Sequence, residues 1–292
     1  MLTDQESKKL EEIAQQLRCD VIEMLLEAKS GHSAGPLGMA DVFTALYFGG
    51  ILNVDPKNPS WEDRDRLILS NGHICPIHYA ALARAGFFPV EELKTLRKFG
   101  SRLQGHPHRG SLAGIENSSG PVSYGSSIAV GMAYAAKIDL PAGRQVRNKW
   151  QVYCIVGDGE QQEGNTWEAV MFAGKHKLDN LTFLMDRNNI QIDGFTEDVM
   201  PLEPLKTKYE AFGWHVLEVD GHNIGEVIDA CQQAKSIYEK PVMIICHTIP
   251  GKGVDFMEWK PEWHGKSPNK EEAETALKQL RSLGGRIKSE AE

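Results

Sequence analysis

Two polar loops in the second half of the chain carry oxygen atoms suited to a hard metal ion. Gly157-Asp158-Gly159 follows an apolar run at 152–156, and Asn188-Asn189 follows another at 181–185. Ligands of open α/β sheets bind beyond the carboxyl ends of such strands. Asp158 offers an anionic oxygen, Asn188 an amide oxygen, and the carbonyl near Ile190 can add a third. We expect these groups to bind Mg²⁺ or Ca²⁺, with water and a ligand's phosphates completing the coordination.

The elements that must position these loops alternate between strand and helix. Apolar strands separated by helices favour a doubly wound parallel sheet with helices on both faces. The pattern predicts strands at 66–69, 152–156, 181–185, 214–219 and 242–246. It predicts helices at 5–28, 39–48, 73–86, 125–137, 163–176 and 224–235, with a helix-breaking segment at 30–36. The polar segment 140–149 is expected to be an exposed loop.

Composition indicates a water-soluble protein of ordinary type. Of its 292 residues 41% are hydrophobic and 25% charged, and the formal net charge of -8 disfavours binding to nucleic acid or anionic membranes. No window reaches the ~18 apolar residues of a membrane helix. The polar start lacks a signal peptide, and five scattered cysteines without CxxC indicate reduced thiols in the cytoplasm. We expect one domain at 1–267 and a charged helical tail at 268–292.

The stretch 154–194 resembles the thiamine diphosphate fingerprint, in which GDG is followed about thirty residues later by NN. Other segments resemble the transketolase family and follow its order along the chain. They are SGHSAGPLGM at 30–39, LSNGH at 69–73, GHP at 105–107 and WHGK at 263–266. The resemblance implies the diphosphate-binding domain of the thiamine diphosphate-binding fold.

The resemblance also implies roles for single residues, position by position. Metal ligands are Asp158, Asn188 and the Ile190 carbonyl, with Mg²⁺ expected and Ca²⁺ or Mn²⁺ as alternatives. Cofactor-binding residues are His73, Gly120, Val122, Asp158, Gly159, Glu163, Asn188 and His264. The catalytic residues that face the sugar are His32, His106 and His264. Glu163 and Glu168 match acidic residues close to the family's subunit interface.

Two segments depart from the family pattern. The usual GSLGQG or GPLGQG reads GPVSYG at 120–125, so that Ser123 and Tyr124 replace a glycine and a glutamine. Pro250 stands where the family often has lysine, two residues before Lys252. Helix packing and contacts to the cofactor at these places are therefore open to change.

The resemblance covers only the first part of a transketolase. The family's activating glutamate and most sugar-phosphate arginines belong to the pyrimidine-binding domain that follows. We therefore expect the N-terminal subunit of a split transketolase of the pentose phosphate pathway, acting on sugar phosphates. A separate C-terminal subunit would complete a heterotetramer with two copies of each chain.

Other functions remain open on the sequence alone. The chain could act on an unusual ketose, or be the alpha subunit of a 2-oxo acid dehydrogenase that transfers an acyl group to lipoamide. SGHSAGPLGM and WHGK argue against the dehydrogenase. A non-catalytic cofactor-binding homologue is a third alternative, suggested by the altered segment 120–125.

Overall fold

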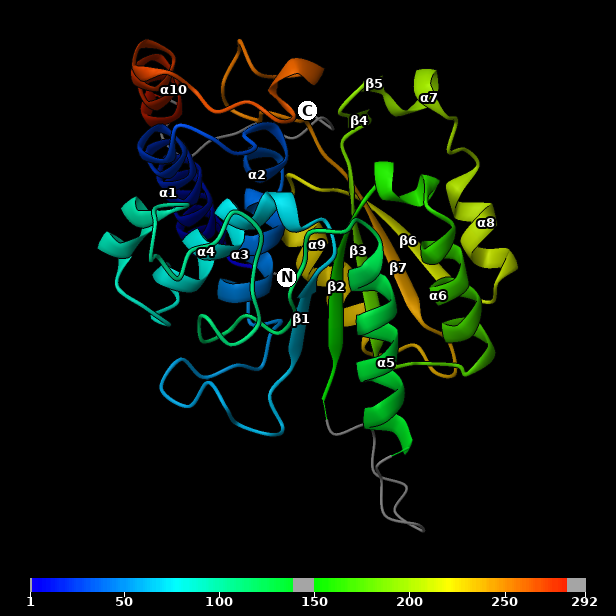
Figure 1. Cartoon of the computed structure of the whole chain (residues 1–292). Coiled ribbons are helices and arrows are strands. Elements are labelled where there is room, and N and C mark those ends of the chain that lie inside the picture. The colour runs from blue at the N-terminus through cyan, green and yellow to red at the C-terminus, as the bar shows by residue number, and fades with distance from the viewer. Residues whose placement is uncertain (1, 139–149, 283–292) are drawn as a thin grey trace.

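The computed structural model describes residues 2–138 and 150–282, and these residues form a parallel sheet flanked by helices (Figure 1). Five strands run in the order β1-β2-β3-β7-β6, all parallel to their neighbours. Their bounds are β1 Arg66–Leu69, β2 Val152–Gly157, β3 Leu181–Arg187, β6 His215–Asp220 and β7 Val242–His247. The predicted sheet class and all five predicted strands are confirmed.

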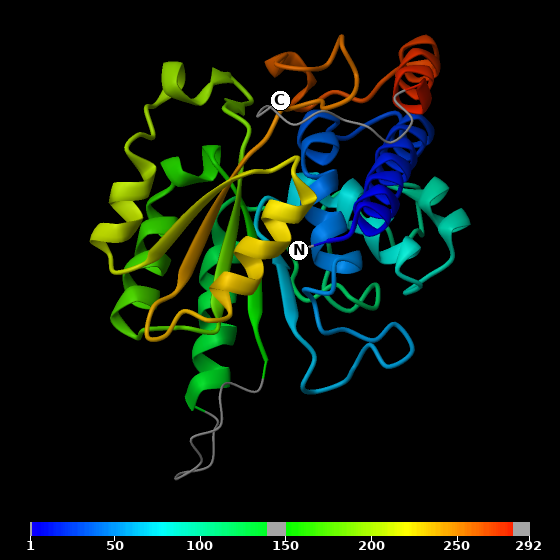
Figure 2. The same ribbon diagram turned by 180° about the vertical axis from the view of Figure 1, so that it is seen from behind.

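Helices cover both faces of this sheet, as predicted. One face is covered by α1 Asp4–Ala28, α3 Ala40–Phe48, α4 Cys75–Arg84 and α9 Ile224–Ala234. The other is covered by α5 Tyr124–Ile138, α6 Gly164–Lys175 and α8 Leu205–Ala211. The view from behind shows α9 lying across the sheet on the face opposite to α5 and α6 (Figure 2).

Alternation of side chains along the strands explains why one sheet supports two hydrophobic cores. On β2, Tyr153 and Ile155 join the core under α1, α3 and α4, whereas Cys154 and Val156 join the core under α5 and α6. Successive side chains of a strand point to opposite faces, so a strand that is apolar at every position must be covered twice. Residues at the strand ends are then the ones free to serve a site.

The sequence missed several short elements. The helix-breaking segment contains a single helical turn, α2 Ala34–Gly38. A small hairpin, β4 Ile190–Gln191 and β5 Gly194–Phe195, follows β3 and leads into α7 Thr196–Val199. Elements of two to five residues show no hydrophobic period, because a period needs several turns or alternations to be recognised.

The helix predicted in the tail is present as α10, Lys270–Ser282, and it packs against α1. Leu280 is fully buried in the same core as α1, and Arg281 forms an ion pair with Glu23. The predicted loop at 140–149 and the last ten residues of the tail lie outside the described residues. Within the described ranges, no helix has the length and apolar character needed to cross a membrane.

Candidate functional site at the carboxyl edge of the sheet

The loops after β1, β2, β3 and β7 gather at one edge of the sheet, the upper edge in Figure 1. Parallel strands bring their carboxyl ends to the same side, so residues far apart in sequence become neighbours there. The predicted Asp158 and Asn188 follow β2 and β3, which pair directly. His73 follows β1 in the same way.

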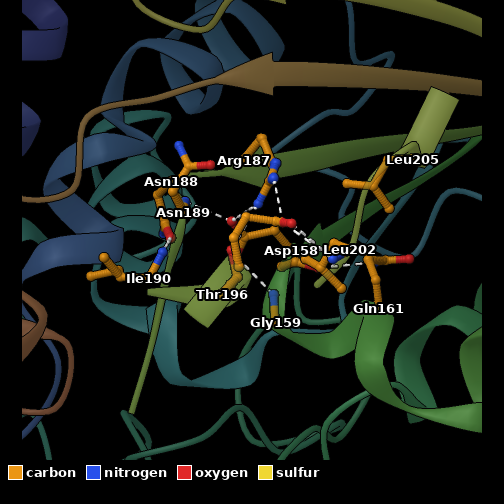
Figure 3. Close-up of polar contacts among 12 residues, drawn as sticks. Asp158, Gly159, Gln161, Arg187, Asn188, Asn189, Ile190, Thr196, Leu202 and Leu205 are labelled. Atoms are coloured by element: carbon orange, nitrogen blue, oxygen red, sulfur yellow. Dashed lines mark hydrogen bonds and ion pairs between the residues drawn. The ribbon is translucent and has the colours of Figure 1, made fainter. Parts of the chain in front are cut away.

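Asp158 is buried and joins the two predicted metal loops. Its Oδ1 accepts a hydrogen bond from the Gly159 amide at 2.7 Å, and its Oδ2 accepts one from the Asn189 amide at 2.6 Å. Figure 3 shows Asp158 at the centre of these contacts, between the two loops. The structure therefore brings the Asp158 carboxylate against the loop that carries Asn188, as the sequence predicted.

Asn188 is held from both ends of its side chain. Its Nδ2 donates to Asp186 Oδ2 at 2.8 Å, and its Oδ1 accepts from the Ile190 amide at 3.0 Å. The Thr248 hydroxyl donates in turn to Asp186 Oδ1 at 2.5 Å. Asp186 and Thr248 thus fix the orientation of the amide, which supporting residues commonly do for metal ligands.

Arg187 is a buried cation beside the predicted metal ligand. Its guanidinium donates to Asp158 Oδ2 at 3.2 Å and also contacts Thr196, Glu197 and Glu203 at 2.9, 2.9 and 3.0 Å. Burial raises the pKa of Asp158 to about 6, and the opposing attraction of Arg187 limits that rise. The carboxylate therefore lies in an environment that favours additional positive charge.

Glu160 is a second buried carboxyl group at this edge, and the sequence interpretation missed it. Its side chain accepts hydrogen bonds from the Ser70 hydroxyl at 2.7 Å, the Ser126 hydroxyl at 3.3 Å and the Gly157 amide at 3.0 Å. It thus ties the loop before His73 to β2 and α5. Burial raises its pKa to about 7.

The predicted histidines form one cluster, although they come from four separate segments. The ring centroid of His32 lies 5.0 Å from that of His73, 6.5 Å from that of His106 and 5.7 Å from that of His264. The His73 and His264 rings are 5.0 Å apart. We call these four residues the histidine cluster.

Small residues bring this cluster against the metal loops. A Cβ atom added to Gly35 would lie 2.8 Å from Ile74 and 3.7 Å from Asp186 Oδ2, so glycine allows the segment after His32 to approach both. The Gly251 amide donates to the Ala34 carbonyl at 2.9 Å, which fixes the loop after β7 on the same segment. The histidine cluster and the metal loops are therefore parts of one site.

The histidines of the cluster are neutral near pH 7. Burial lowers the pKa of His32 to about 4, assisted by the neighbouring His264, Arg97 and His106. Burial also lowers the pKa of His73 well below its ordinary value and lowers those of His106 and His264. Neutral imidazoles both donate and accept hydrogen bonds, which suits hydroxyl and carbonyl groups of a sugar.

Three buried polar atoms around this site have no hydrogen-bond partner within the described ranges: His32 Nδ1, Asn71 Oδ1 and Ser119 Oγ. Buried polar groups are normally paired, so these three atoms are available to bind a ligand or a water molecule. Among the described residues no three or more His, Cys, Asp or Glu side chains form a metal site. The groups that could hold a divalent ion at this edge are therefore the oxygens of Asp158, Asn188 and Ile190, of which only the Asp158 carboxylate carries a negative charge.

The other predicted positions lie on the segment 120–125 and on α6. The Gly120 amide lies 3.3 Å from where a Cβ on Gly72 would be, and Val122 is partly exposed. Glu163 is the N-cap residue of α6, and it and Glu168 are exposed on that helix. At the altered segment, Ser123 adopts a positive φ of 73° and its carbonyl accepts from Asn165 Nδ2 at 2.9 Å.

The sequence interpretation therefore named the groups proposed to contact the metal and the ligand, but not the side chains that hold these groups in place. Glu160, Asp186 and Arg187 all lie inside the recognised stretch 154–194. One signal in the sequence was a charged residue at the end of a buried strand or directly after it, because a buried charge requires a partner. Their partners could not be identified, because Ser70 and Thr248 are distant in sequence.

Comparisons with known proteins agree with this geometry. The family model of the transketolase thiamine diphosphate binding domain matches residues 9–284. A 6-deoxy-6-sulfo-D-fructose transketolase subunit of Clostridium sp. is 45% identical over 87% of this chain and 90% of its own length. One of the subunits of the apulose-4-phosphate transketolase of Phocaeicola vulgatus is 40% identical over 89% of both chains.

A solved structure shows the same fold within a longer protein. Transketolase from Campylobacter jejuni superposes with a TM-score of 0.87 and 36% identity, covering 98% of this chain but 45% of the other. The chain thus spans less than half the length of that transketolase, whereas it matches the separate subunits along most of theirs. The chain belongs to the transketolase family, in which it corresponds to the thiamine diphosphate binding domain.

Proposed function

We propose that this chain is the N-terminal, diphosphate-binding subunit of a split transketolase. The enzyme would transfer a two-carbon ketol unit from a ketose phosphate to an aldose phosphate in the cytoplasm. The observation that carries this proposal is the convergence of His32, His73, His106 and His264 beside the Asp158 and Asn188 loops. A metal-diphosphate site next to neutral hydrogen-bonding groups is what ketol transfer requires.

Asp158, Asn188 and the Ile190 carbonyl would hold a divalent ion, which we infer to be Mg²⁺, with Ca²⁺ or Mn²⁺ as alternatives. Gly159 and His73 would contact the diphosphate, and Gly120 and Val122 would line the cofactor. Thiamine diphosphate, when bound, supplies a nucleophilic carbon and an electron sink for cleavage of a carbon–carbon bond. Protein residues then need to place the sugar and stabilise charge on its oxygens.

The neutral imidazoles are suited to this second task. His32 lies at the centre of the cluster, because its ring lies within 6.5 Å of those of His73, His106 and His264. A donor fixed close to an oxygen that gains negative charge lowers the barrier to reaction. We assign His32, His106 and His264 to the sugar hydroxyls and the reacting carbonyl.

A second chain would complete the enzyme. Exposed apolar side chains lie on α5 and α6, among them Tyr124, Met171 and Phe172, close to the exposed Glu163 and Glu168. The relatives that match along most of their length are named as subunits. We infer that a C-terminal subunit with the pyrimidine-binding domain covers this face, in a heterotetramer with two copies of each chain.

A specialised ketose is a second candidate for the substrate. Two relatives carry the names of 6-deoxy-6-sulfo-D-fructose and apulose-4-phosphate transketolases, and both are at least 40% identical to this chain. The two names give different ketoses, although both relatives align with most of this chain. The donor of this enzyme is therefore to be sought among modified as well as ordinary ketose phosphates.

The decisive experiment compares the chain alone with the chain co-expressed with the product of a neighbouring transketolase-like gene. We expect ketol transfer only from the combined subunits, with thiamine diphosphate and Mg²⁺ present. Robust turnover by the isolated chain would refute the split enzyme. A combined enzyme that uses 2-oxo acids and lipoamide instead would identify the dehydrogenase alternative, and cofactor binding without turnover of any donor would identify a non-catalytic homologue.

A further inference from the structure

Arg97 lies at the edge of the histidine cluster, where the sequence interpretation gave it no role. A Cβ atom added to Gly105 would lie 2.8 Å from Arg97 Nε, and one added to Gly31 would lie 3.9 Å from the same nitrogen. Gly31 and Gly105 directly precede His32 and His106. The guanidinium therefore packs against the two glycines that lead into two histidines of the cluster.

The backbone holds Arg97 in an unusual conformation. Its φ is 59°, in the left-handed region that residues other than glycine rarely adopt. Its amide donates to the Leu103 carbonyl at 2.9 Å, and both Leu96 and Leu103 are buried. Strained backbone that is fixed by its surroundings occurs preferentially at functional positions.

The positive charge of Arg97 is not neutralised by a carboxylate within the described part of the chain. Its guanidinium donates only to the Gly105 carbonyl, at 3.3 Å, and its side chain is exposed. The neighbouring cations behave differently, because Lys98 pairs with Glu27 at 3.4 Å and Arg102 pairs with Glu92 at 2.7 Å. In a chain of net charge -8, a cation without a counter-charge beside the site is available to a ligand.

The charge of Arg97 also reaches the histidines. Burial lowers the pKa of His106, and the nearby Arg97 lowers it further. The same cation contributes to the lowered pKa of His32. The packing of Arg97 against Gly31 and Gly105 places it beside both imidazoles, so one ligand can contact all three side chains.

We propose that Arg97 contributes to substrate specificity by binding the anionic group of the ketose donor from this chain, beside the sugar-phosphate arginines that the partner subunit would supply. This inference rests on the proposed transketolase function. A guanidinium presents a planar set of donors that matches the oxygens of a phosphate or sulfonate. The histidine cluster would bind the uncharged hydroxyl and carbonyl groups, and Arg97 would read the charged end. Phosphate and sulfonate share this chemistry.

The test measures KM and kcat of the combined two-subunit enzyme with three donors at about pH 8, where the histidines are neutral. The donors are fructose 6-phosphate, 6-deoxy-6-sulfo-D-fructose and uncharged fructose. We compare wild type with Arg97→Gln, with Arg97→Lys, and with Lys98→Gln as a control that removes a paired charge one residue away. Thermal unfolding of each variant measures whether the fold is retained.

We expect Arg97→Gln to raise KM for an anionic donor roughly tenfold to a hundredfold, the usual effect of losing a charged hydrogen bond. KM for fructose and kcat should change little, Arg97→Lys should recover part of the loss, and Lys98→Gln should match wild type. The anionic donor with the larger change identifies phosphate or sulfonate as the natural group. Equal losses with all three donors, or no loss with the anionic donors, would overturn the role of Arg97. Failure of the wild-type enzyme with these donors and with the other candidate ketose phosphates, apulose 4-phosphate included, would instead refute the proposed function itself.

Discussion

The metal loops and the histidine cluster lie at the same edge of the sheet, yet burial shifts their pKa values in opposite directions. It raises the pKa of Asp158 to about 6 and those of Glu160 and Asp186 to about 7, whereas it lowers that of His32 to about 4. Both shifts favour the uncharged form, because burial disfavours charge of either sign. The difference is that a bound cation would favour the charged form of the carboxylates, whereas the histidines are proposed to work without charge.

The largest effect should follow from removing Asp158, the one anionic group among the proposed metal ligands. We expect Asp158→Ala to lose metal-dependent binding of thiamine diphosphate by at least about 100-fold, or about 2.7 kcal/mol. Arg187 retains Glu197 and Glu203 as partners, so the fold should persist. Calorimetric titration with the cofactor, with and without Mg²⁺, measures the loss.

Asp193→Ala is the matched control, because Asp193 is an exposed acid in the adjoining hairpin. It should bind the cofactor as wild type does. Unchanged affinity of Asp158→Ala would show that the metal is held elsewhere.

The next largest effect tests the histidine cluster. His264→Ala and His32→Ala should each lower kcat of the combined enzyme by about 10²–10³, or 2.7–4 kcal/mol, if each is a main donor to the reacting oxygen. Binding of thiamine diphosphate should be lost far less than in Asp158→Ala. Steady-state kinetics beside calorimetry separates the two effects.

His108→Ala provides the control for this series, since His108 is exposed and lies two residues from His106 outside the cluster. Its kcat should be normal. Near-normal turnover of both cluster variants would remove the histidines from the chemistry.

A smaller effect tests whether burial favours the protonated form of the Glu160 carboxyl group in the metal-free chain. The pKa of Glu160 is raised from 4.5 to about 7 in the fold, so its contribution to stability is complete below pH ~4.5 and is lost as pH rises through 7. Glu160→Gln cannot ionise, and its amide can still donate to the Ser70 and Ser126 hydroxyls. Wild type should therefore lose stability relative to Glu160→Gln by on the order of 1–3 kcal/mol between pH 5 and 8.

Urea unfolding with a chelator present, repeated across this pH range, measures the difference. Glu163→Gln, which changes an exposed acid in the next turn, should follow wild type at every pH. Parallel curves for wild type and Glu160→Gln would mean that the Glu160 carboxyl titrates as it does in water.

The metal loops and the histidine cluster also differ in how far they could be predicted from the sequence. Asp158 and Asn188 lie in one continuous stretch, each directly after an apolar strand, and the geometry of neighbouring parallel strands brings them together. The positions of His32, His73, His106 and His264 follow no period. They could be assigned only through the family resemblance, because tertiary contacts rather than local pattern create the cluster.

The residues that support the metal loops show more clearly what could not be predicted from the sequence. Glu160 contacts Ser70 and Ser126, which are 90 and 34 residues away in the chain. Nothing local in the sequence links these side chains, so their hydrogen bonds emerge only when β1, β2 and α5 are packed together. The left-handed backbone of Arg97 is likewise set by its hydrogen bond to Leu103 and not by its own residue type.

The smallest predicted effect concerns the segment 120–125, which contacts α6 and the loop before His73. Its carbonyl at Ser123 is bound by Asn165 of α6, while the Gly120 amide lies next to Gly72 of the loop before His73. Ser123 has a φ of 73°, where the family has glycine and where a Cβ atom costs about 1 kcal/mol. Ser123→Gly should therefore be more stable than Ser123→Ala by about that amount, although both lose the hydroxyl.

Ser127, exposed on α5, is the control with the opposite sign. At a right-handed helical position glycine is less stable than alanine by about 0.8–1 kcal/mol, so Ser127→Gly should be the weaker of that pair. The midpoint of urea unfolding orders all four variants. If alanine is also the better residue at position 123, the segment is not left-handed, and the serine that replaces the family's glycine carries no strain. If glycine is better, the chain keeps Ser123 at a cost in stability, which the Asn165 contact to its hydroxyl at 3.2 Å partly offsets.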